Sequence, residues 1–226
     1  MKHLSVICLI LFLGAPVIAQ DRMPMIPDDK MTDAQKKGME VRRSQQEARA
    51  EACKTGVIDA AKCTPEYFGV HGPMVPLLRS PEVMVVANAM MNYLEYKTAL
   101  PHNVRELVVL IVAREWTAQY LWNSHYATGL EQGLSPDLVK AIAEGRRPSK
   151  MTDEEEITYD FCQELHRNQS VSDATYARAL AKFGEQGIID MVSVDGVYSY
   201  MSKVMNVART PAPKNAKAPP LAPFPR

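Results

Sequence analysis

Two ionisable side chains within one apolar stretch are the candidates for chemistry in this chain of 226 residues. Glu106 stands directly before the apolar run 107–113, and His125 shares its predicted helical face with Trp122 and Leu121. A carboxylate and an imidazole that meet in a dry site form a general acid/base pair, tuned by burial and by each other's charge. The same two residues would also suit a structural hydrogen bond between helices, and spacing alone favours that second interpretation.

The elements that must position this pair are predicted to be helices. Apolar content extends from Val104 to Trp116, which is too long for a typical strand. We therefore predict a helix that is apolar on all sides and is the most buried element of the fold. A following helix over about 118–132 carries His125 and ends at Gly133, a residue type that favours helix C-termini.

The rest of the pattern is also helical and predicts an all-α fold. Capping signals, prolines at first helical positions and apolar residues at three-and-four spacing indicate the other helices. These cover about 32–54, 81–97, 135–145, 152–167, 172–184 and 185–208. The stretch 53–80, broken by prolines and glycines, is predicted to be a long irregular connection. Tyr198 and Tyr200 on the last helix either line the same pocket or, as is more common for such residues, belong to the core.

The chain begins with a signature of export. Lys2 supplies a positive start, the run 4–13 is apolar, and small residues lead to Ala19. This order predicts a signal peptide over residues 1–19. A permanent anchor needs about 20 apolar residues, and this run breaks at Gly14. The mature protein is therefore expected to be periplasmic or secreted, without membrane attachment after cleavage.

Three regions are expected to follow the signal peptide. Residues 20–31 are polar with two prolines and are predicted to be a flexible leader, and residues 32–209 form the helical domain. Residues 210–226 hold six prolines in 17 positions, so this tail cannot continue a helix or join a sheet. It is predicted to be extended or disordered.

Charge and cysteine usage narrow the function classes. With 26 basic and 26 acidic residues the formal net charge is zero, so no nucleic-acid partner is expected. In an oxidising compartment Cys53 and Cys63 are a possible disulfide, although two independent cysteines are an equal alternative. Cys162 is predicted to be a buried, inert thiol. His166 is predicted to be an exposed residue at a helix end, where its charge suits the helix dipole.

The stretch RELVVLIVAREWTAQYLWNSHYATGLEQGLS, residues 105–135, resembles the carboxymuconolactone decarboxylase family of the alkylhydroperoxidase AhpD-like superfamily. In the peroxidase branch a glutamate, two cysteines and a histidine occur at fixed spacing. On this chain the pattern falls on Glu106, Ala118, Leu121 and His125, so the spacing is kept and both thiols are absent. A peroxidase of this kind needs an attacking thiolate and a resolving thiol. Thiol peroxidase activity is therefore the least expected function.

Further segments extend this resemblance beyond the central motif. Residues 72–83 look like the family's entry into its first core helix, and residues 159–192 look like the C-terminal half of a longer subgroup. The resemblance thus covers about 32–213. It implies an AhpD-like orthogonal helical bundle that assembles as a homo-oligomer, a trimer or a hexamer.

The decarboxylase branch implies a site and a reaction class. Its Tyr-x-Trp-x-x-His run is similar to Tyr120, Trp122 and His125. The resemblance implies a carboxy-lyase or isomerase acting on a small carboxylated or lactone-type substrate. Glu106 and His125 would be the catalytic acid/base pair. Trp122, Tyr120 and Arg105 would bind substrate, with the arginine facing its carboxylate.

Alternatives stay open beside this enzyme hypothesis. Arg105 and Arg114 also suit ordinary ion pairs, and the whole chain also suits a non-catalytic oligomeric binding or scaffold protein. His102, Glu106 and His125 would supply two imidazoles and one carboxylate for a metal, but nothing in the resemblance supports His102 as a ligand. No metal is therefore predicted. No Gly-rich phosphate loop or paired Cys-x-x-Cys occurs, so no cofactor is expected.

Overall fold

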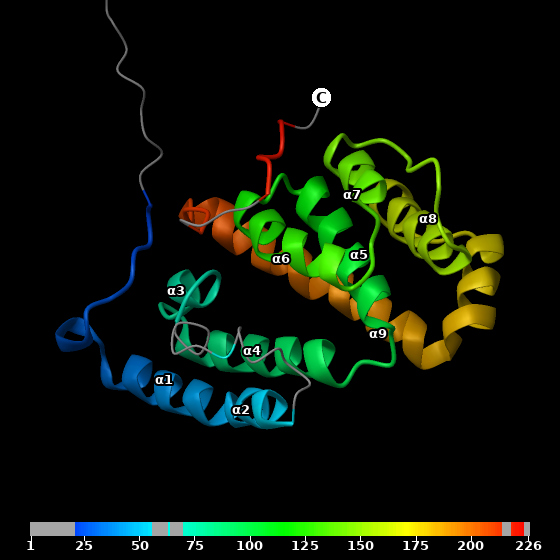
Figure 1. Cartoon of the computed structure of the whole chain (residues 1–226). Helices are drawn as coiled ribbons and strands as arrows, with labels where there is room; N and C mark the ends of the chain where they lie inside the picture. The colour runs from blue at the N-terminus through cyan, green and yellow to red at the C-terminus, as the bar shows by residue number, and fades with distance from the viewer. Residues whose placement is uncertain (1–20, 56–62, 64–69, 214–217, 224–226) are drawn as a thin grey trace, which may run out of the picture.

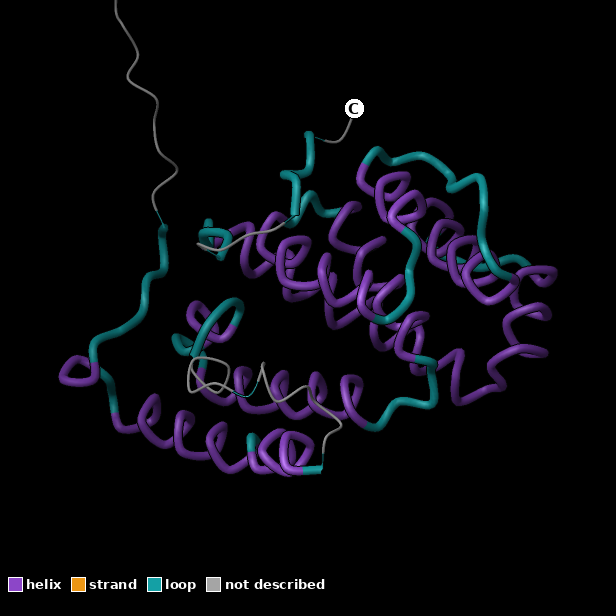
Figure 2. Tube along the Cα trace, viewed as in Figure 1, coloured by secondary structure: helices purple, strands orange, loops and turns teal. Residues whose placement is uncertain are grey.

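The computed structural model describes residues 21–55, 63, 70–213 and 218–223. Within these residues every regular element is a helix, which confirms the all-α class (Figure 2). The predicted signal peptide, residues 1–19, lies outside the described residues. No helix in the described part of the chain is both long and apolar enough to cross a membrane.

The central element of the fold is α5 (His102–Glu115), against which the helices of the C-terminal half pack (Figure 1). These helices are α6 (Gln119–Glu131), α7 (Pro136–Ala143), α8 (Asp153–Asn168) and α9 (Asp173–Ala208). The N-terminal half forms a second layer of α1 (Asp33–Gln45), α2 (Glu47–Lys54), α3 (Met74–Leu77) and α4 (Pro81–Tyr96). The two layers meet where α4 packs against α9.

The central helix is as buried as its composition predicts. All residues from Val104 to Arg114 are buried, and the apolar ones among them are at most 2% exposed. The helix is not apolar on every side, however, because Arg105, Glu106 and Arg114 are buried with it. Buried charges must be paired, so these three residues show where polar contacts enter the core.

The first predicted helix, 32–54, is two helices that join at Gln46. The N–H of Gln46 is shared by the carbonyls of Arg42 and Arg43, a tightening that is common at helix ends. Thr32 caps α1 through a capping box, as its sequence predicts. Gly38 lets α1 lie close to α4, because a Cβ there would stand 2.7 Å from Pro81 Cβ.

The last helix is interrupted where its glycine predicts. Gly184 has φ of 67° and ψ of 177°, a conformation that side-chain-bearing residues avoid, and it divides α9 into two segments. The hydroxyl of Ser172 caps the first segment by accepting from the Thr175 N–H. The second segment, 185–208, spans the molecule and presents different faces to α4 and α5.

The leader and the tail were both predicted to be loose. Where the structure describes them, both pack against the helical bundle. In the leader, the Arg22 N–H donates to the Ala208 carbonyl and Met31 is buried. In the tail, residues 218–223 are extended, but they are held on the α5–α6 corner and Leu221 is buried. Residues 218–223 are thus extended, which is one of the two states predicted for the tail. Prolines exclude helix and sheet, but they do not prevent side chains of the bundle from binding the tail's backbone.

Candidate functional site

The predicted pair does meet in the core. Glu106 lies in the first turns of α5, and His125 lies in the middle of α6. His125 Nδ1 donates a hydrogen bond to Glu106 at 2.9 Å. Glu106 also accepts from Arg105 Nη2 at 2.7 Å on its other carboxylate oxygen. The result is a chain of three side chains, Arg105–Glu106–His125, whose central carboxylate is 1% exposed.

Arg105 is a partner of Glu106 and does not face a substrate. Its guanidinium is buried, and its second terminal nitrogen donates to the Glu95 carbonyl at 2.7 Å. The expectation that it binds a substrate carboxylate is corrected, because the carboxylate of Glu106 already occupies that position. A planar guanidinium can serve a carboxylate and a backbone carbonyl at once, which fixes the rotamer of Glu106.

The electrostatics of the chain keep Glu106 ionised. Burial alone raises the pKa of a carboxyl group, but the charge and hydrogen bond of His125, and then those of Arg105, lower the pKa of Glu106 below its ordinary value. Burial lowers the pKa of Arg105, but the negative charge of Glu106, the charges of Tyr198 and Glu95 and the hydrogen bond to Glu106 together outweigh burial, so the net pKa is raised. The core therefore holds a fixed carboxylate against a fixed guanidinium.

The imidazole of His125 is oriented by this carboxylate. Because an ionised carboxylate only accepts, Nδ1 must carry the hydrogen of this bond. The ring is held from the side by Tyr198, at a centroid distance of 5.2 Å and an interplanar angle of 83°. The His125 side chain is 19% exposed, and its bond to Glu106 is its one hydrogen bond within the described residues. Nε2 therefore makes no hydrogen bond to another described residue, and the side chain is partly exposed.

The two predicted aromatic site residues do not join His125 in a pocket. Trp122 is fully buried, and its indole N–H donates to the Pro219 carbonyl at 3.0 Å. Tyr120 packs on Gly72 and its hydroxyl lies 3.5 Å from His71 Nδ1. The polar group of Trp122 is bound by the tail, and that of Tyr120 lies beside the 70–73 loop.

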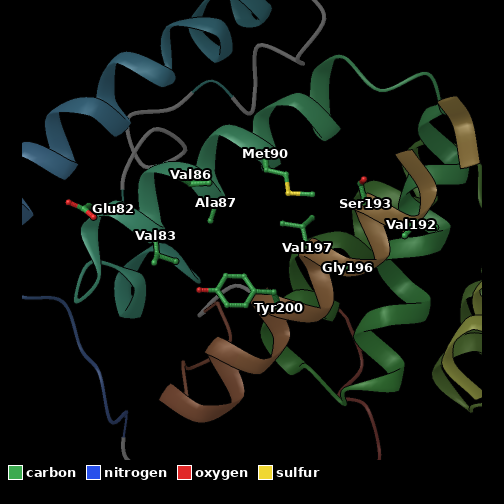
Figure 3. Close-up of a pocket in the computed structure, with 10 residues that line it drawn as sticks. All are labelled: Glu82, Val83, Val86, Ala87, Met90, Val192, Ser193, Gly196, Val197 and Tyr200. Atoms are coloured by element: carbon green, nitrogen blue, oxygen red, sulfur yellow. The ribbon is translucent and has the colours of Figure 1, made fainter. Parts of the chain in front are cut away.

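A well-formed pocket lies elsewhere, between α4 and α9. It has a volume of about 590 Å³ and is almost wholly apolar. Figure 3 shows its walls, with labelled side chains of α4 on one side and of α9 on the other. The lining residues are Glu82, Val83, Val86, Ala87, Met90, Val192, Ser193, Gly196, Val197 and Tyr200.

This pocket does not contain the predicted pair. Neither Glu106 nor His125 lines it, and Tyr198, which contacts His125, lies on another face of α9 than Val197 and Tyr200. The periodicity of α4 did signal an apolar face. The sequence did not show that part of this face stays uncovered, since that depends on how far α4 and α9 are separated.

A second histidine–carboxylate pair was missed by the sequence analysis. His166 Nε2 lies 2.6 Å from Asp195 Oδ2, and the side chains are 10% and 9% exposed. The prediction of a solvated helix-end histidine is wrong because the second segment of α9 covers this end of α8. Burial lowers the pKa of His166, but its bond to Asp195 and the nearby negative charge raise it more. Nothing in the spacing of these two residues signals that they meet.

The cysteines follow their predictions. Cys53 and Cys63 form a disulfide, so the open choice between a bridge and two thiols is decided for the bridge. Cys162 is fully buried, and burial, reinforced by Asp195, raises the pKa of its thiol well above the ordinary value. No group of three or more His, Cys, Asp or Glu residues within the described residues is placed to hold a metal ion.

The chain was compared with protein-family profiles and with curated proteins, and neither comparison found a match.

Proposed function

We propose that this protein is an acid/base catalyst of the carboxymuconolactone decarboxylase type. The observation that carries the proposal is the Arg105–Glu106–His125 chain, which leaves one imidazole nitrogen available. The spacing of Glu106 and His125 within the segment 105–135 supports the same family and its AhpD-like bundle. The substrate class is a small carboxylated or lactone-type molecule.

The proposed chemistry uses His125 as the group that moves the proton. For an isomerase, Nε2 removes a proton from carbon next to a carbonyl, the electron pair passes into the enolate, and the imidazolium returns the proton to another carbon of the enolate. For a lyase, the bond to the carboxylate breaks, carbon dioxide leaves, and the protonated imidazole donates a proton to the carbanion carbon. In both cases Glu106 stabilises the imidazolium and holds the ring, without itself reaching the substrate.

A thiol mechanism finds no support in these residues. The positions that carry cysteines in the peroxidase branch, Ala118 and Leu121, are buried apolar residues. The free cysteine of the described chain, Cys162, lies on α8 with a raised pKa, so its thiolate is disfavoured.

A second candidate is a non-catalytic oligomeric binding or scaffold protein. One observation favours it: the well-formed pocket is apolar and excludes Glu106 and His125. In that case the buried pair joins α5 to α6 and has no chemical role. A carboxylated ligand would also be a poor fit to a pocket whose one charged lining residue is the acidic Glu82.

Export and self-assembly complete the proposal. The Cys53–Cys63 disulfide supports a periplasmic or secreted location, because such bonds persist in oxidising compartments. Large apolar side chains on the open faces of α4 and α9 support a homo-oligomer, because monomers seldom leave such a surface uncovered. A trimer or hexamer fits the family resemblance.

The decisive experiment follows carbon acids in heavy water by NMR. Small lactones and carboxylated dienes are incubated with the native protein, with His125→Gln and with His102→Gln, a matched change at an exposed histidine. We expect deuterium incorporation or loss of carbon dioxide with the native protein and with His102→Gln. His125→Gln should lose at least about 100-fold of the rate, the usual range for a general acid/base. Absence of turnover across the panel would favour the scaffold candidate.

A further inference from the structure

The described tail, residues 218–223, is bound through its backbone by side chains of the bundle. The Gln119 side-chain amide contacts both backbone groups of Leu221: Oε1 accepts from the N–H at 3.1 Å, and Nε2 donates to the carbonyl at 2.7 Å. This is the pairing that a neighbouring β-strand would offer, supplied here by one side chain. Such backbone bonds would hold any extended segment in this position.

Two more side chains continue the same pattern on either side of Leu221. The Trp122 indole donates to the Pro219 carbonyl at 3.0 Å, and Arg114 Nη1 donates to the Ala222 carbonyl at 2.7 Å. Three side chains therefore donate hydrogen bonds to the carbonyls of three tail residues. All three come from the corner where α5 ends and α6 begins.

The tail's own side chains contribute at one position. Leu221 is 5% exposed and joins the hydrophobic core, whereas the flanking prolines and Ala222 are exposed. The sequence Ala-Pro-Pro-Leu-Ala-Pro favours an extended, polyproline-like backbone and therefore loses little entropy on binding. Recognition thus requires an extended proline-rich backbone with one leucine.

We propose that Arg114, Gln119 and Trp122 form a binding site for Pro-Pro-Leu segments of other protein chains, which the protein's own tail occupies as a tethered competitor. The tail is held by a single anchoring side chain and four hydrogen bonds to its backbone. The indole N–H of Trp122 is buried, so an emptied site lacks an acceptor that a new peptide carbonyl would restore. This inference does not depend on the proposed role of His125.

The test uses the full chain with Leu221→Asp, which weakens the tail and leaves the site residues intact. The probe is a capped peptide with the sequence of residues 218–223, followed by calorimetry and by the Trp122 indole N–H signal in NMR. A tethered tail competes at an effective concentration in the mM range. We therefore expect the peptide to bind Leu221→Asp at least about tenfold more tightly than the native chain. The same peptide with aspartate in place of leucine should not bind.

Matched variants and a second measurement make the outcome decisive. In the Leu221→Asp chain, Gln119→Ala should abolish peptide binding, and Gln132→Ala, at the far end of α6, should leave it unchanged. In the native chain, excess peptide should speed hydrogen exchange of the Leu221 N–H, since a displaced tail exposes this amide to water. Equal binding by the two glutamine variants would overturn the proposal. Leu221 exchange that excess peptide leaves unchanged would overturn it as well.

Discussion

At the scale of single residues, one carboxylate organises the core. Glu106 stands between a guanidinium and an imidazole, at 2.7 Å and 2.9 Å, and is 1% exposed. A buried carboxylate in this position compensates the positive charge of Arg105 and orients the ring of His125. Its charge therefore matters to the folded state whether or not the protein is an enzyme.

The first prediction is that Glu106→Gln destabilises the protein by about 3–5 kcal/mol, the usual cost of breaking a buried ion pair. The amide keeps the shape of the side chain but leaves the Arg105 charge buried without compensation. Urea unfolding followed by circular dichroism measures the change. Glu40→Gln on the exposed face of α1 is the control and should stay within about 0.5 kcal/mol of the native protein. Equal stability of the two variants would contradict the ionised assignment of Glu106.

The second prediction concerns pH and the His166–Asp195 pair. Because the pKa of His166 is raised in the folded protein, its contribution is fully present below the unfolded imidazole pKa of about 6.5. The contribution is lost as pH rises through the raised folded value. The free-energy difference between the native protein and His166→Gln should therefore shrink as pH increases across this range. A difference that is constant with pH would argue against the charged pair.

The lowered pKa of Glu106 acts in the opposite direction. Its stabilising contribution is present above the unfolded carboxyl pKa and is lost as pH falls through the lower, folded value. The stability difference between the native protein and Glu106→Gln should therefore shrink as pH falls from the ordinary glutamate pKa toward the lower, folded value. Glu106→Gln lacks this titration, which separates the two histidine–carboxylate pairs in the same set of measurements.

At the scale of elements, the break in α9 depends on one glycine. Gly184 has φ of 67° and has open space where a Cβ would stand, and Gly196 in the same helix also has open space but ordinary helical geometry. The two positions therefore differ in backbone conformation and not in crowding.

This contrast gives the third prediction. Gly184→Ala should destabilise by about 1–3 kcal/mol, the strain of a side chain in that backbone region. Gly196→Ala should stabilise by about 0.5–1 kcal/mol, because alanine restricts the unfolded chain and suits a helix. Thermal and urea unfolding of both variants measure the two signs. Similar effects at both positions would contradict the bend as the reason for Gly184.

At the scale of the whole molecule, an apolar surface of α4 and α9 is left open. Val86 is 70% exposed and Ile189 is 63% exposed, and Val83, Met90 and Val192 are exposed between 40% and 44%. Val83, Val86 and Met90 of this surface also form the α4 wall of the pocket. A surface of this kind is expected to be covered by another copy of the chain in the proposed oligomer.

The fourth prediction tests this assembly. Light scattering after gel filtration should give the native protein the mass of an oligomer, and Val86→Glu should give the mass of a monomer, because a carboxylate would be buried in the contact. Leu180→Glu, on the first segment of α9, places the same charge on an exposed apolar residue outside this surface and should leave the mass unchanged. A native protein that is monomeric would contradict the proposed homo-oligomer.

Local signals in the sequence determined the helices, several of their caps and the break at Gly184. They also determined the burial of the helix after Val104, since apolar periodicity depends only on neighbouring residues. The pairing of Glu106 with His125 followed from adjacent helices with facing positions. These features need no knowledge of how distant elements cross.

Only the tertiary structure decided which distant groups meet. It brought the Trp122 indole to the tail and His166 to Asp195, and it left the α4–α9 surface open. Each of these contacts joins elements whose separation and crossing angle come from packing the entire core. No periodicity within a single helix carries that information.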